Sequence, residues 1–316
     1  MKPSNRRDFL HMAARWSLAS GSIPLAALFL HGCKTMGAVA DIGTAIGTST
    51  GTISESQAES IRTSAYAVAR SFEDFTPEQE YYIGRSVGAE ILETYPPYED
   101  PALNRYVNLL GQTLAQMSDR PETFSGYRFL IQDSDDINAL SAPGGFIFVT
   151  RGMLRCCRSE DALAATLAHE IGHVQAKHGL QAIKQARVTE ALTTIGLESA
   201  KTFGGEELAQ LTRTFESSIA DITRTLITNG YSRELEGDAD AAAVTIMRRV
   251  GYDPNALIDM LTVMSQQLVP GRLDFARTHP TPAARMSAIQ PKIGAYRPVS
   301  LQTRRQRRFQ NALESL

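Results

Sequence analysis

The sequence predicts a mainly α-helical protein with a small β-sheet, an α+β fold. Apolar residues recur three and four positions apart along much of the chain, which is the spacing of amphipathic helices. Two short segments, residues 127–132 and 145–150, are instead apolar and rich in aromatic or β-branched residues, which is typical of strands. With 43% hydrophobic and 21% charged residues, the chain has the composition of a globular protein.

Helices are predicted, in chain order, over residues 77–94, 101–117, 160–178 and 208–226 and from 232 onward. Thr76 and Asp100, each followed by a proline, and Ser159 supply N-terminal caps. The Pro-Gly-Gly run at residues 143–145 separates the two strands and indicates a turn there.

The charge balance excludes one class of function. The chain has 32 Lys+Arg against 34 Asp+Glu, a formal net charge of −2 over 316 residues, so no nucleic acid is predicted as a partner. Three cysteines are too few for a disulfide scaffold. A chain of this length is expected to hold one large domain or two small ones.

Residues 1–32 have the pattern of an export signal. The twin arginine at positions 6–7, followed by Phe and Leu, resembles the signal of the Tat route for folded proteins. The sequence LHGC, which ends at Cys33, resembles a lipobox, whose cysteine receives a diacylglycerol. Cys33 is therefore the predicted lipidation site, and residues 33–72 are predicted to hold the body on a flexible tether.

The apolar stretch inside this signal has a second interpretation, a single transmembrane anchor. Arg15, Gly21 and Pro24 interrupt it, which leaves it marginal for a hydrocarbon core of about 30 Å. The lipoprotein interpretation places the body on the periplasmic side, held to the bilayer by acylated Cys33. Lys34 gives no inner-membrane retention signal, so the outer membrane is expected in a two-membrane bacterium.

The chemistry of the sequence is concentrated at His169-Glu170-Ile171-Gly172-His173. Two histidines four positions apart share one face of a helix, so both imidazoles can reach one Zn²⁺. Glu170 projects about 100° away, towards a water on the metal. The histidines lie opposite the bulky apolar stripe, beside small residues that allow another helix to approach, which argues against two surface histidines.

A zinc site of this kind needs a third protein ligand, and residues 232–240 offer four acids. Glu236 and Asp240 fall on the apolar face of the predicted helix, whereas Glu234 and Asp238 fall on the opposite, solvated face. Two carboxylates on a buried face are costly without a cation or strong donors. Zinc on Glu236, and a ligand imidazole N–H donated to Asp240, would satisfy both.

These motifs together resemble a known family. HEIGHV, beginning at His169, followed about sixty residues later by E-x-x-A-D, beginning at Glu236, resembles the HtpX and CAAX-prenyl-protease (Ste24-like) family of zinc metallopeptidases. DDINALSAPGGFIFVTRGML resembles the family's N-A-x-x-x-P-G-G strand segment, and ARTHPTPAARMSAI resembles its Thr-His-Pro element. The resemblance covers residues 76–292 in matching order and points to the soluble periplasmic branch with BepA and LoiP.

The resemblance implies a zincin-like (gluzincin) fold with its active site on the HExxH helix, a peptidase domain over residues 73–292 and a basic tail over 293–316. It also implies one zinc ion per chain. The implied roles are zinc ligation by His169, His173 and Glu236, general base for Glu170, orientation of a histidine by Asp240, substrate-backbone binding at Asn138 and Ala139, and catalytic positions facing the zinc for His279 and Arg285.

Some of these residues have plainer interpretations. Asn138 beside an alanine is often only a turn residue, and the Thr-His-Pro segment around His279 is also typical of a loop that enters a helix. His178 lies on the core side of the predicted helix and is interpreted as structural. Cys156 and Cys157 are interpreted as two buried thiols rather than a strained vicinal disulfide.

The basic run at residues 304–308 is interpreted as a solvated helix, with contact to anionic lipid headgroups as the alternative.

The function implied is a membrane-anchored zinc endopeptidase that cuts unfolded or misassembled envelope proteins. The alternative is a chaperone that holds the same proteins in the same cleft, for which Glu170 would be unnecessary. His279 is predicted to regulate access: it would block the site by filling the fourth zinc position, or it would donate a hydrogen bond to the oxyanion from nearby.

Overall fold

The computed structural model describes most of the chain from residue 75 onward and a shorter stretch before it. The described residues are 36–51, 54–56, 58–59, 62, 75–184, 230–267, 279, 281–297, 302–314 and 316. The predicted export signal, Cys33 and the predicted helix over 208–226 lie outside them. Two compact units are distinguished, one of residues 1–74 and 184–214, the other of residues 75–183 and 215–316.

The first unit contains helix α3 (Met36–Ser49), in a segment where the sequence predicts a flexible tether. Thr48 Oγ1 donates to the Thr44 carbonyl at 3.0 Å, and Ser49 Oγ donates to the Ile46 carbonyl at 2.9 Å. These hydroxyls bond to carbonyls of the preceding turn and so do not compete with the helix for its amides. This part of the segment is therefore regular structure.

The second unit begins with two helices that confirm the predicted starts. Helix α5 (Pro77–Thr94) has a capping box in which Thr76 and Gln79 exchange side-chain and backbone bonds. Helix α6 (Pro101–Ala115) is capped by Asp100, which accepts from two backbone amides of the first turn.

A three-stranded sheet follows, with β1 (Arg128–Gln132), β2 (Ala139–Ala142) and β3 (Phe146–Thr150) in the order β1-β3-β2. β3 pairs in parallel with β1 and antiparallel with β2. The sequence predicts β1 and β3 but not β2. The Pro-Gly-Gly turn (η2, Pro143–Gly145) therefore joins β2 to β3, and Gly144 and Gly145 have φ values of 77° and 96°, which suit glycine.

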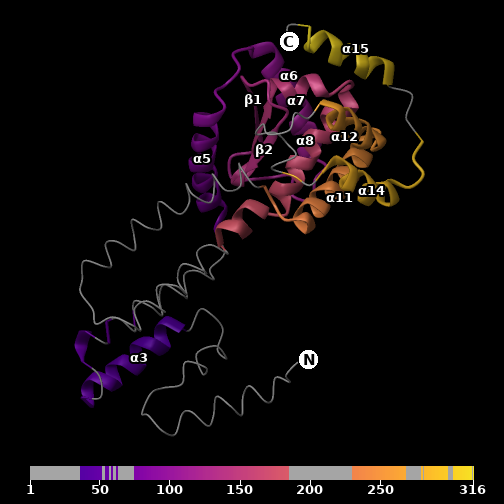
Figure 1. The fold of residues 1–316 in the computed structure, drawn as a ribbon. Helices are drawn as coiled ribbons and strands as arrows, with labels where there is room; N and C mark the ends of the chain where they lie inside the picture. Colours follow the sequence, from indigo (N-terminus) through magenta and orange to yellow (C-terminus); the bar gives the residue numbers. More distant parts are fainter. Residues whose placement is uncertain are drawn as a thin grey trace. The chain divides into compact units, whose positions relative to one another are not determined.

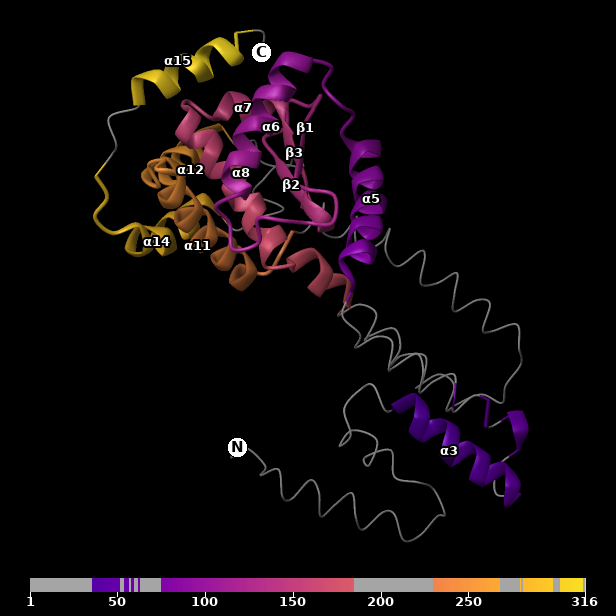
Figure 2. The ribbon, with the colours of Figure 1, turned by 180° about the vertical axis from the view of Figure 1, so that it is seen from behind.

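Alternate residues of the sheet face opposite sides. Leu140 and Phe148 pack against α5, whereas Ile147 and Val149 face the larger core. Figures 1 and 2 show α5 on one side of the sheet and α8, α11 and α12 on the other. Ser141 has the same strand parity as Ala139, so it faces the α8 side. The mainly helical fold with one small sheet is thus confirmed.

Helix α8 (Glu160–Gln175) carries the HExxH motif through the centre of this core. It follows the short helix α7 (Arg151–Cys156), and Ser159 caps it by accepting from the Ala162 amide, as predicted. The helix ends earlier than predicted, because Lys177 adopts a left-handed conformation with φ 57°. Residues 178–184 then form a new helical segment.

Helices α11 (Arg233–Val250) and α12 (Asn255–Gln267) pack beside α8, and α14 (Pro282–Ile293) packs on α11 and α12. The backbones of α8 and α11 touch at Gly172, where an added Cβ would lie 2.9 Å from the Ala239 carbonyl oxygen. The predicted close approach of a second helix beside the histidines is therefore confirmed.

The C-terminal helix α15 (Gln302–Ala312) packs on the start of α8, where the sequence predicts a solvated basic helix. Arg308 forms two bonds with the buried carboxylate of Glu160, and Arg305 is itself buried against Asp161. Two of the arginines are therefore structural. None of the helices in the described ranges has the length and apolar character needed to cross a bilayer.

Candidate metal centre

Four side chains that can bind a metal meet between α8 and α11. His169 and His173 come from α8, Glu236 from the first turn of α11, and His279 from the segment before α14. One potential ligand atom of each lies within 4.8 Å of the others, and all four side chains are buried. The structure therefore brings the predicted zinc ligands together with His279.

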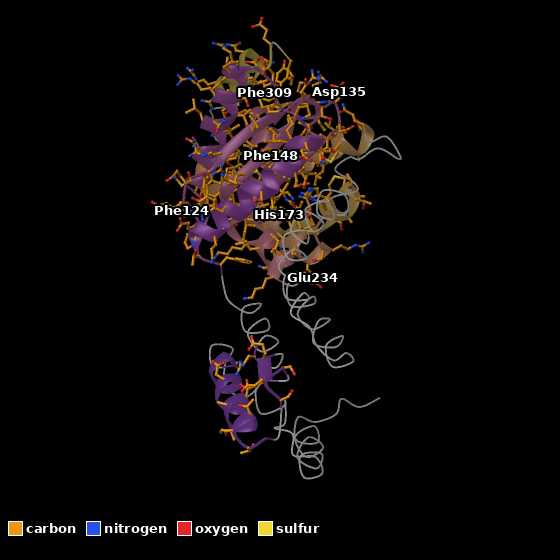
Figure 3. All side chains as sticks on the ribbon, turned by 90° about the vertical axis from the view of Figure 1, so that its left-hand side faces the viewer. Phe124, Asp135, Phe148, His173, Glu234 and Phe309 are labelled. Atoms are coloured by element: carbon orange, nitrogen blue, oxygen red, sulfur yellow. The ribbon has the colours of Figure 1, made fainter. Side chains whose placement is uncertain are left out.

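The predicted inward and outward faces of α11 are also confirmed. Glu236 and Asp240 are 1% and 2% exposed, whereas Glu234 and Asp238 are exposed to solvent. Figure 3 shows Glu234 at the margin of the folded body, while His173 lies within it.

The potential ligand atoms of His169, His173 and Glu236 have separations close to those that tetrahedral zinc requires. His169 Nε2 lies 3.2 Å from His173 Nε2 and 3.5 Å from Glu236 Oε2, and His173 Nε2 lies 3.4 Å from Glu236 Oε1. Zinc bonds to nitrogen and oxygen are about 2.0–2.1 Å long, so its ligand atoms lie about 3.3–3.4 Å apart. The two imidazole nitrogens and the Glu236 carboxylate therefore lie close enough together to share one zinc ion.

Unsatisfied carboxylate oxygens support the same conclusion. Among the described residues, Glu170 Oε1 and Glu236 Oε1 are buried and have no hydrogen-bond donor. Burial raises the pKa of Glu236, but the imidazoles of His279, His169 and His173 lower it well below its ordinary value. A buried ionised carboxylate needs a cation, and two imidazoles with one carboxylate are a donor set that fits Zn²⁺.

An outer layer orients His169. Its Nδ1 lies 2.9 Å from Asp240 Oδ1, and Arg285 of α14 donates through Nη2 to Oδ1 at 2.5 Å and through Nε to Oδ2 at 3.1 Å. Burial raises the pKa of Asp240, but the Arg285 guanidinium lowers it well below its ordinary value. The bond to Asp240 fixes Nδ1 of His169, which leaves Nε2 towards the metal group.

Arg285 lies elsewhere than the family resemblance implies. Its Nη2 is 3.1 Å from Nδ1 of His169, whereas His173 and Glu236 lie at Nε2 on the other edge of that ring. Arg285 therefore reaches the site through Asp240 and His169, an arrangement that favours positioning over contact with a substrate.

His178 contacts the metal centre, which the sequence did not predict. Its Nδ1 lies 2.9 Å from Nδ1 of His173, and the ring is 1% exposed. Tyr231 stacks on the same ligand histidine, with the rings of Tyr231 and His173 4.4 Å apart and 21° from parallel. Burial lowers the pKa of His178 to about 4, so this imidazole is neutral.

His279 contacts the carboxylate of the metal group. Its Nδ1 lies 2.7 Å from Glu236 Oε2, and the two groups are hydrogen-bonded. This distance is shorter than the about 3.3 Å that separates two ligands of one zinc ion. The imidazole is 7% exposed, so this contact is buried. The loop before it, over residues 268–278, lies outside the described residues.

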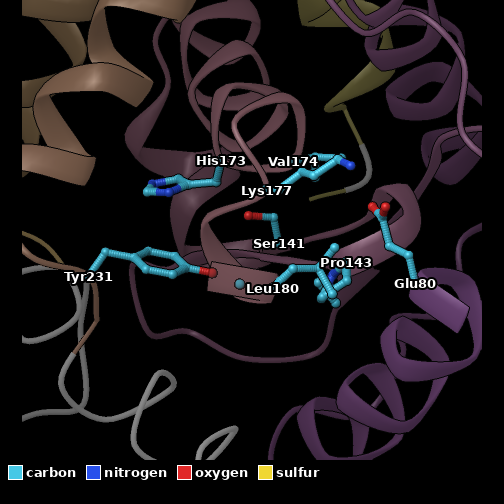
Figure 4. A pocket seen from close by; sticks show the side chains of 10 residues that line it. Glu80, Ser141, Pro143, His173, Val174, Lys177, Leu180 and Tyr231 are labelled. Atoms are coloured by element: carbon cyan, nitrogen blue, oxygen red, sulfur yellow. The ribbon is translucent and has the colours of Figure 1, made fainter. Parts of the chain in front are cut away.

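The substrate-binding edge predicted at Asn138 and Ala139 coincides with β2, the strand at the edge of the sheet. Both residues are buried, and Asn138 bonds to Thr150 of β3 through its backbone. Farther along β2, Ser141 and the residue after it line a pocket beside His173. Figure 4 shows this pocket, with Ser141 between His173 and Pro143.

Cys156 and Cys157 are free and buried, which confirms the prediction of two buried thiols. Burial raises the pKa of Cys156 to about 11 and that of Cys157 to about 12, so both thiols stay protonated at neutral pH.

Comparisons with known proteins agree with this geometry. The chain is 26% identical over 232 residues to the beta-barrel assembly-enhancing protease of Escherichia coli (strain K12), which is 71% of this chain and 46% of that protein. It is 27% identical over 228 residues to the mitochondrial metalloendopeptidase OMA1 of Schizosaccharomyces pombe, 70% of this chain and 63% of that protein. The chain thus spans about half the length of the beta-barrel assembly-enhancing proteases.

A model of peptidase family M48 matches residues 101–293, a range that contains the three candidate zinc ligands, Glu170, Asp240 and His279. The HtpX and Ste24-like group named from the sequence motifs is a related branch of that family. Because the match covers more than half of the chain and includes the whole metal centre, the chain belongs to peptidase family M48.

Proposed function

We propose that this chain is a zinc-dependent endopeptidase. The observation that carries the proposal is the close grouping of the two Nε2 atoms of His169 and His173, 3.2 Å apart, with the two carboxylate oxygens of Glu236 at 3.4 and 3.5 Å. Beside this group lies a buried glutamate, Glu170, with an unsatisfied oxygen. One ion per chain would be held by these three residues. Bound zinc would lower the pKa of a water molecule and polarise the scissile carbonyl.

Glu170 is the proposed general base. It follows His169 on α8, is 1% exposed and leaves Oε1 without a donor among the described residues. This oxygen can take a proton from the attacking water and return it to the leaving amine. A carboxylate held by internal donors would be a poorer base, so the absence of such donors suits this role.

An extended polypeptide is the proposed substrate. β2 is an edge strand, and an edge strand can pair with an added chain through its backbone. Asn138 and Ala139 would lie at the start of that pairing, and Ser141, farther along the strand, would bring the paired chain beside His173. Unfolded or misassembled proteins expose such extended segments, whereas folded proteins do not.

Envelope proteins of a bacterium are the proposed source of these segments. The name of the beta-barrel assembly-enhancing protease supports this class of substrate, and the sequence of residues 1–33 supports export followed by acylation of Cys33. The body would then work on the periplasmic side of a membrane, with the outer membrane as the expected site.

His279 is the proposed gate of the centre. Its hydrogen bond to Glu236 places an imidazole against a ligand carboxylate, where it can compete with water for the remaining coordination position. A protease held among envelope proteins would then rest closed until this contact opens.

The test is a casein digest by the full chain loaded with zinc, with and without a zinc chelator. Cleavage should stop with the chelator, and Glu170→Gln should lower the rate by about 10²- to 10⁴-fold while zinc content and thermal stability are retained. Glu234→Gln, an exposed acid of α11, is the matched control and should cut like the wild type. Casein that is bound but not cut by the wild type would instead indicate a chaperone.

A further inference from the structure

The two histidines of the HExxH motif have different outer partners. His169 Nδ1 faces the carboxylate of Asp240 at 2.9 Å, whereas His173 Nδ1 faces the imidazole nitrogen of His178, also at 2.9 Å. An ionised carboxylate can only accept a hydrogen bond, whereas each nitrogen of an imidazole can donate or accept. In the contact between His173 and His178, the nitrogen that carries the hydrogen in one ring therefore fixes which nitrogen carries it in the other.

This contact exists because α8 is interrupted. On a continuous helix, residues five positions apart point about 140° away from each other, and their rings do not meet. Lys177 has φ 57°, a left-handed conformation that is uncommon for a lysine, and it turns the chain so that His178 lies back against His173. The backbone therefore adopts a less favoured conformation at the residue that makes this contact possible.

The surroundings hold the imidazole of His178 in place. A Cβ added to Gly179 would lie 3.3 Å from both Tyr231 Oη and Pro143 Cγ, so this turn is packed closely on both sides. The rings of His173 and His178 are 5.0 Å apart and nearly perpendicular, and the ring of Tyr231 lies 5.8 Å from that of His178.

The direction of the hydrogen bond follows from the metal side of His173. Its Nε2 lies with Nε2 of His169 and the carboxylate of Glu236, so Nε2 is the nitrogen available to a metal. A neutral imidazole that binds metal through Nε2 carries its hydrogen on Nδ1. His173 Nδ1 therefore donates, His178 Nδ1 accepts, and the hydrogen of His178 lies on its Nε2.

We propose that His178 is a positioning residue of the metal centre, which holds His173 in the tautomer and orientation that present Nε2 to zinc. The inference rests on the proposed function, because it assigns His178 a role towards the same ion. Outer partners of this kind typically change metal affinity by about 10- to 100-fold when they are removed. His178 thus does for His173 what Asp240 does for His169.

Two substitutions at this position separate the hydrogen bond from packing. His178→Leu fills similar space without an acceptor, whereas His178→Asn places an amide oxygen near the position of Nδ1. The zinc dissociation constant, measured by competition with a chromophoric chelator, should rise about 10- to 100-fold for His178→Leu. It should return most of the way to the wild-type value for His178→Asn.

Cobalt and NMR measurements read the same contact without relying on activity. The absorption bands of the Co²⁺-substituted protein should change in His178→Leu and be restored in His178→Asn. The chain has six histidines, so selective ¹⁵N labelling of the imidazoles of the zinc-loaded wild type is practicable. It should show hydrogen on Nδ1 of His173 and on Nε2 of His178.

Glu234→Gln, an exposed acid of α11, is the control and should leave zinc affinity unchanged. Equal zinc affinity and equal cobalt spectra in the wild type and His178→Leu would overturn the inference, as would hydrogen on Nδ1 of His178 in the wild type. The NMR result decides the matter even where the leucine variant does not fold. A wild type that binds no zinc would instead contradict the proposed function itself.

Discussion

The two ends of α8 bury carboxylates in contrasting ways. At its start, Glu160 is completely buried and accepts hydrogen bonds from Tyr106 Oη at 2.9 Å, from Tyr252 Oη at 2.8 Å and from Arg308. Ten residues later on the same helix, Glu170 is buried to a similar degree, yet Oε1 has no donor among the described residues. Residue type and burial do not distinguish the two, since both are buried glutamates of the same helix.

The difference shows which buried charge serves the fold and which awaits a ligand. A buried carboxylate that is bonded on all sides contributes to holding elements together, here α6, α8 and α15. One with an unsatisfied oxygen costs free energy in the folded state and persists only where function requires it.

The largest effect is expected at the ligand carboxylate. Glu236→Gln removes the ionised oxygen that the metal needs, so zinc affinity should fall by more than the about 10- to 100-fold that loss of an outer partner causes. Metal analysis after dialysis against a weak chelator measures this. Glu234→Gln, two residues earlier on the exposed face, is the matched control, and equal zinc content in the two variants would contradict the assignment.

Removal of the His279 imidazole tests the proposed gate. If His279 closes the site, His279→Ala should raise the rate of peptide cleavage several-fold, because water reaches the remaining position more often. If it instead donates to the oxyanion, kcat should fall by about 10²-fold or more with zinc retained. Steady-state cleavage of a short peptide distinguishes the two outcomes, and the fall would show that the gate is wrong.

At the other end of α8, Glu160→Gln should lower stability and spare the metal. The amide loses the ion pair with Arg308, so the free energy of unfolding should fall by about 1–3 kcal/mol. Urea unfolding of the zinc-loaded protein measures it. Zinc affinity should be unchanged, in contrast with Glu236→Gln, and a loss of zinc here would mean that the two ends are not independent.

The smallest effect concerns pH. Burial raises the pKa of Glu160, but the hydrogen bonds from Arg308, Tyr252 and Tyr106 lower it by a larger amount, so the pKa is below its ordinary value. Its stabilising contribution is therefore fully present above the ordinary glutamate pKa of about 4.3 and is lost as the pH falls through the lower, folded value. The difference in Tm between wild type and Glu160→Gln should be constant near neutral pH and shrink in acid. A difference in Tm that grows in acid would contradict the lowered pKa of Glu160.

Local patterns in the sequence predict the ligands but not everything around them. His169, His173 and Glu236 follow from helical periodicity, because each lies on a helix that is regular at that point. The contact of His178 with His173 does not follow from periodicity. An unbroken helix would point His178 towards the core, but the left-handed conformation of Lys177 interrupts the helix. A lysine carries no local signal for a left-handed conformation.

Two other features depend on partners that are distant in sequence. β2 contains no β-branched or aromatic residue, so its extended conformation comes from pairing with β3 rather than from the strand preference of its own residues. Arg305 and Arg308 form a charge run that is typical of a solvated helix. Their partners, Asp161 and Glu160, lie on a helix about 150 residues earlier, which no local pattern indicates.

The contact of α8 with α11 at Gly172 limits how closely the two halves of the metal centre can approach each other. Backbone lies against backbone there, so α8 and α11 are as near to each other as two helices can be at that point. Even one added methyl group would act as a wedge: Gly172→Ala would move Glu236 away from His169 and His173, although position 172 binds nothing itself. The absence of a side chain at this one residue therefore holds ligands from two distant parts of the sequence within reach of one ion.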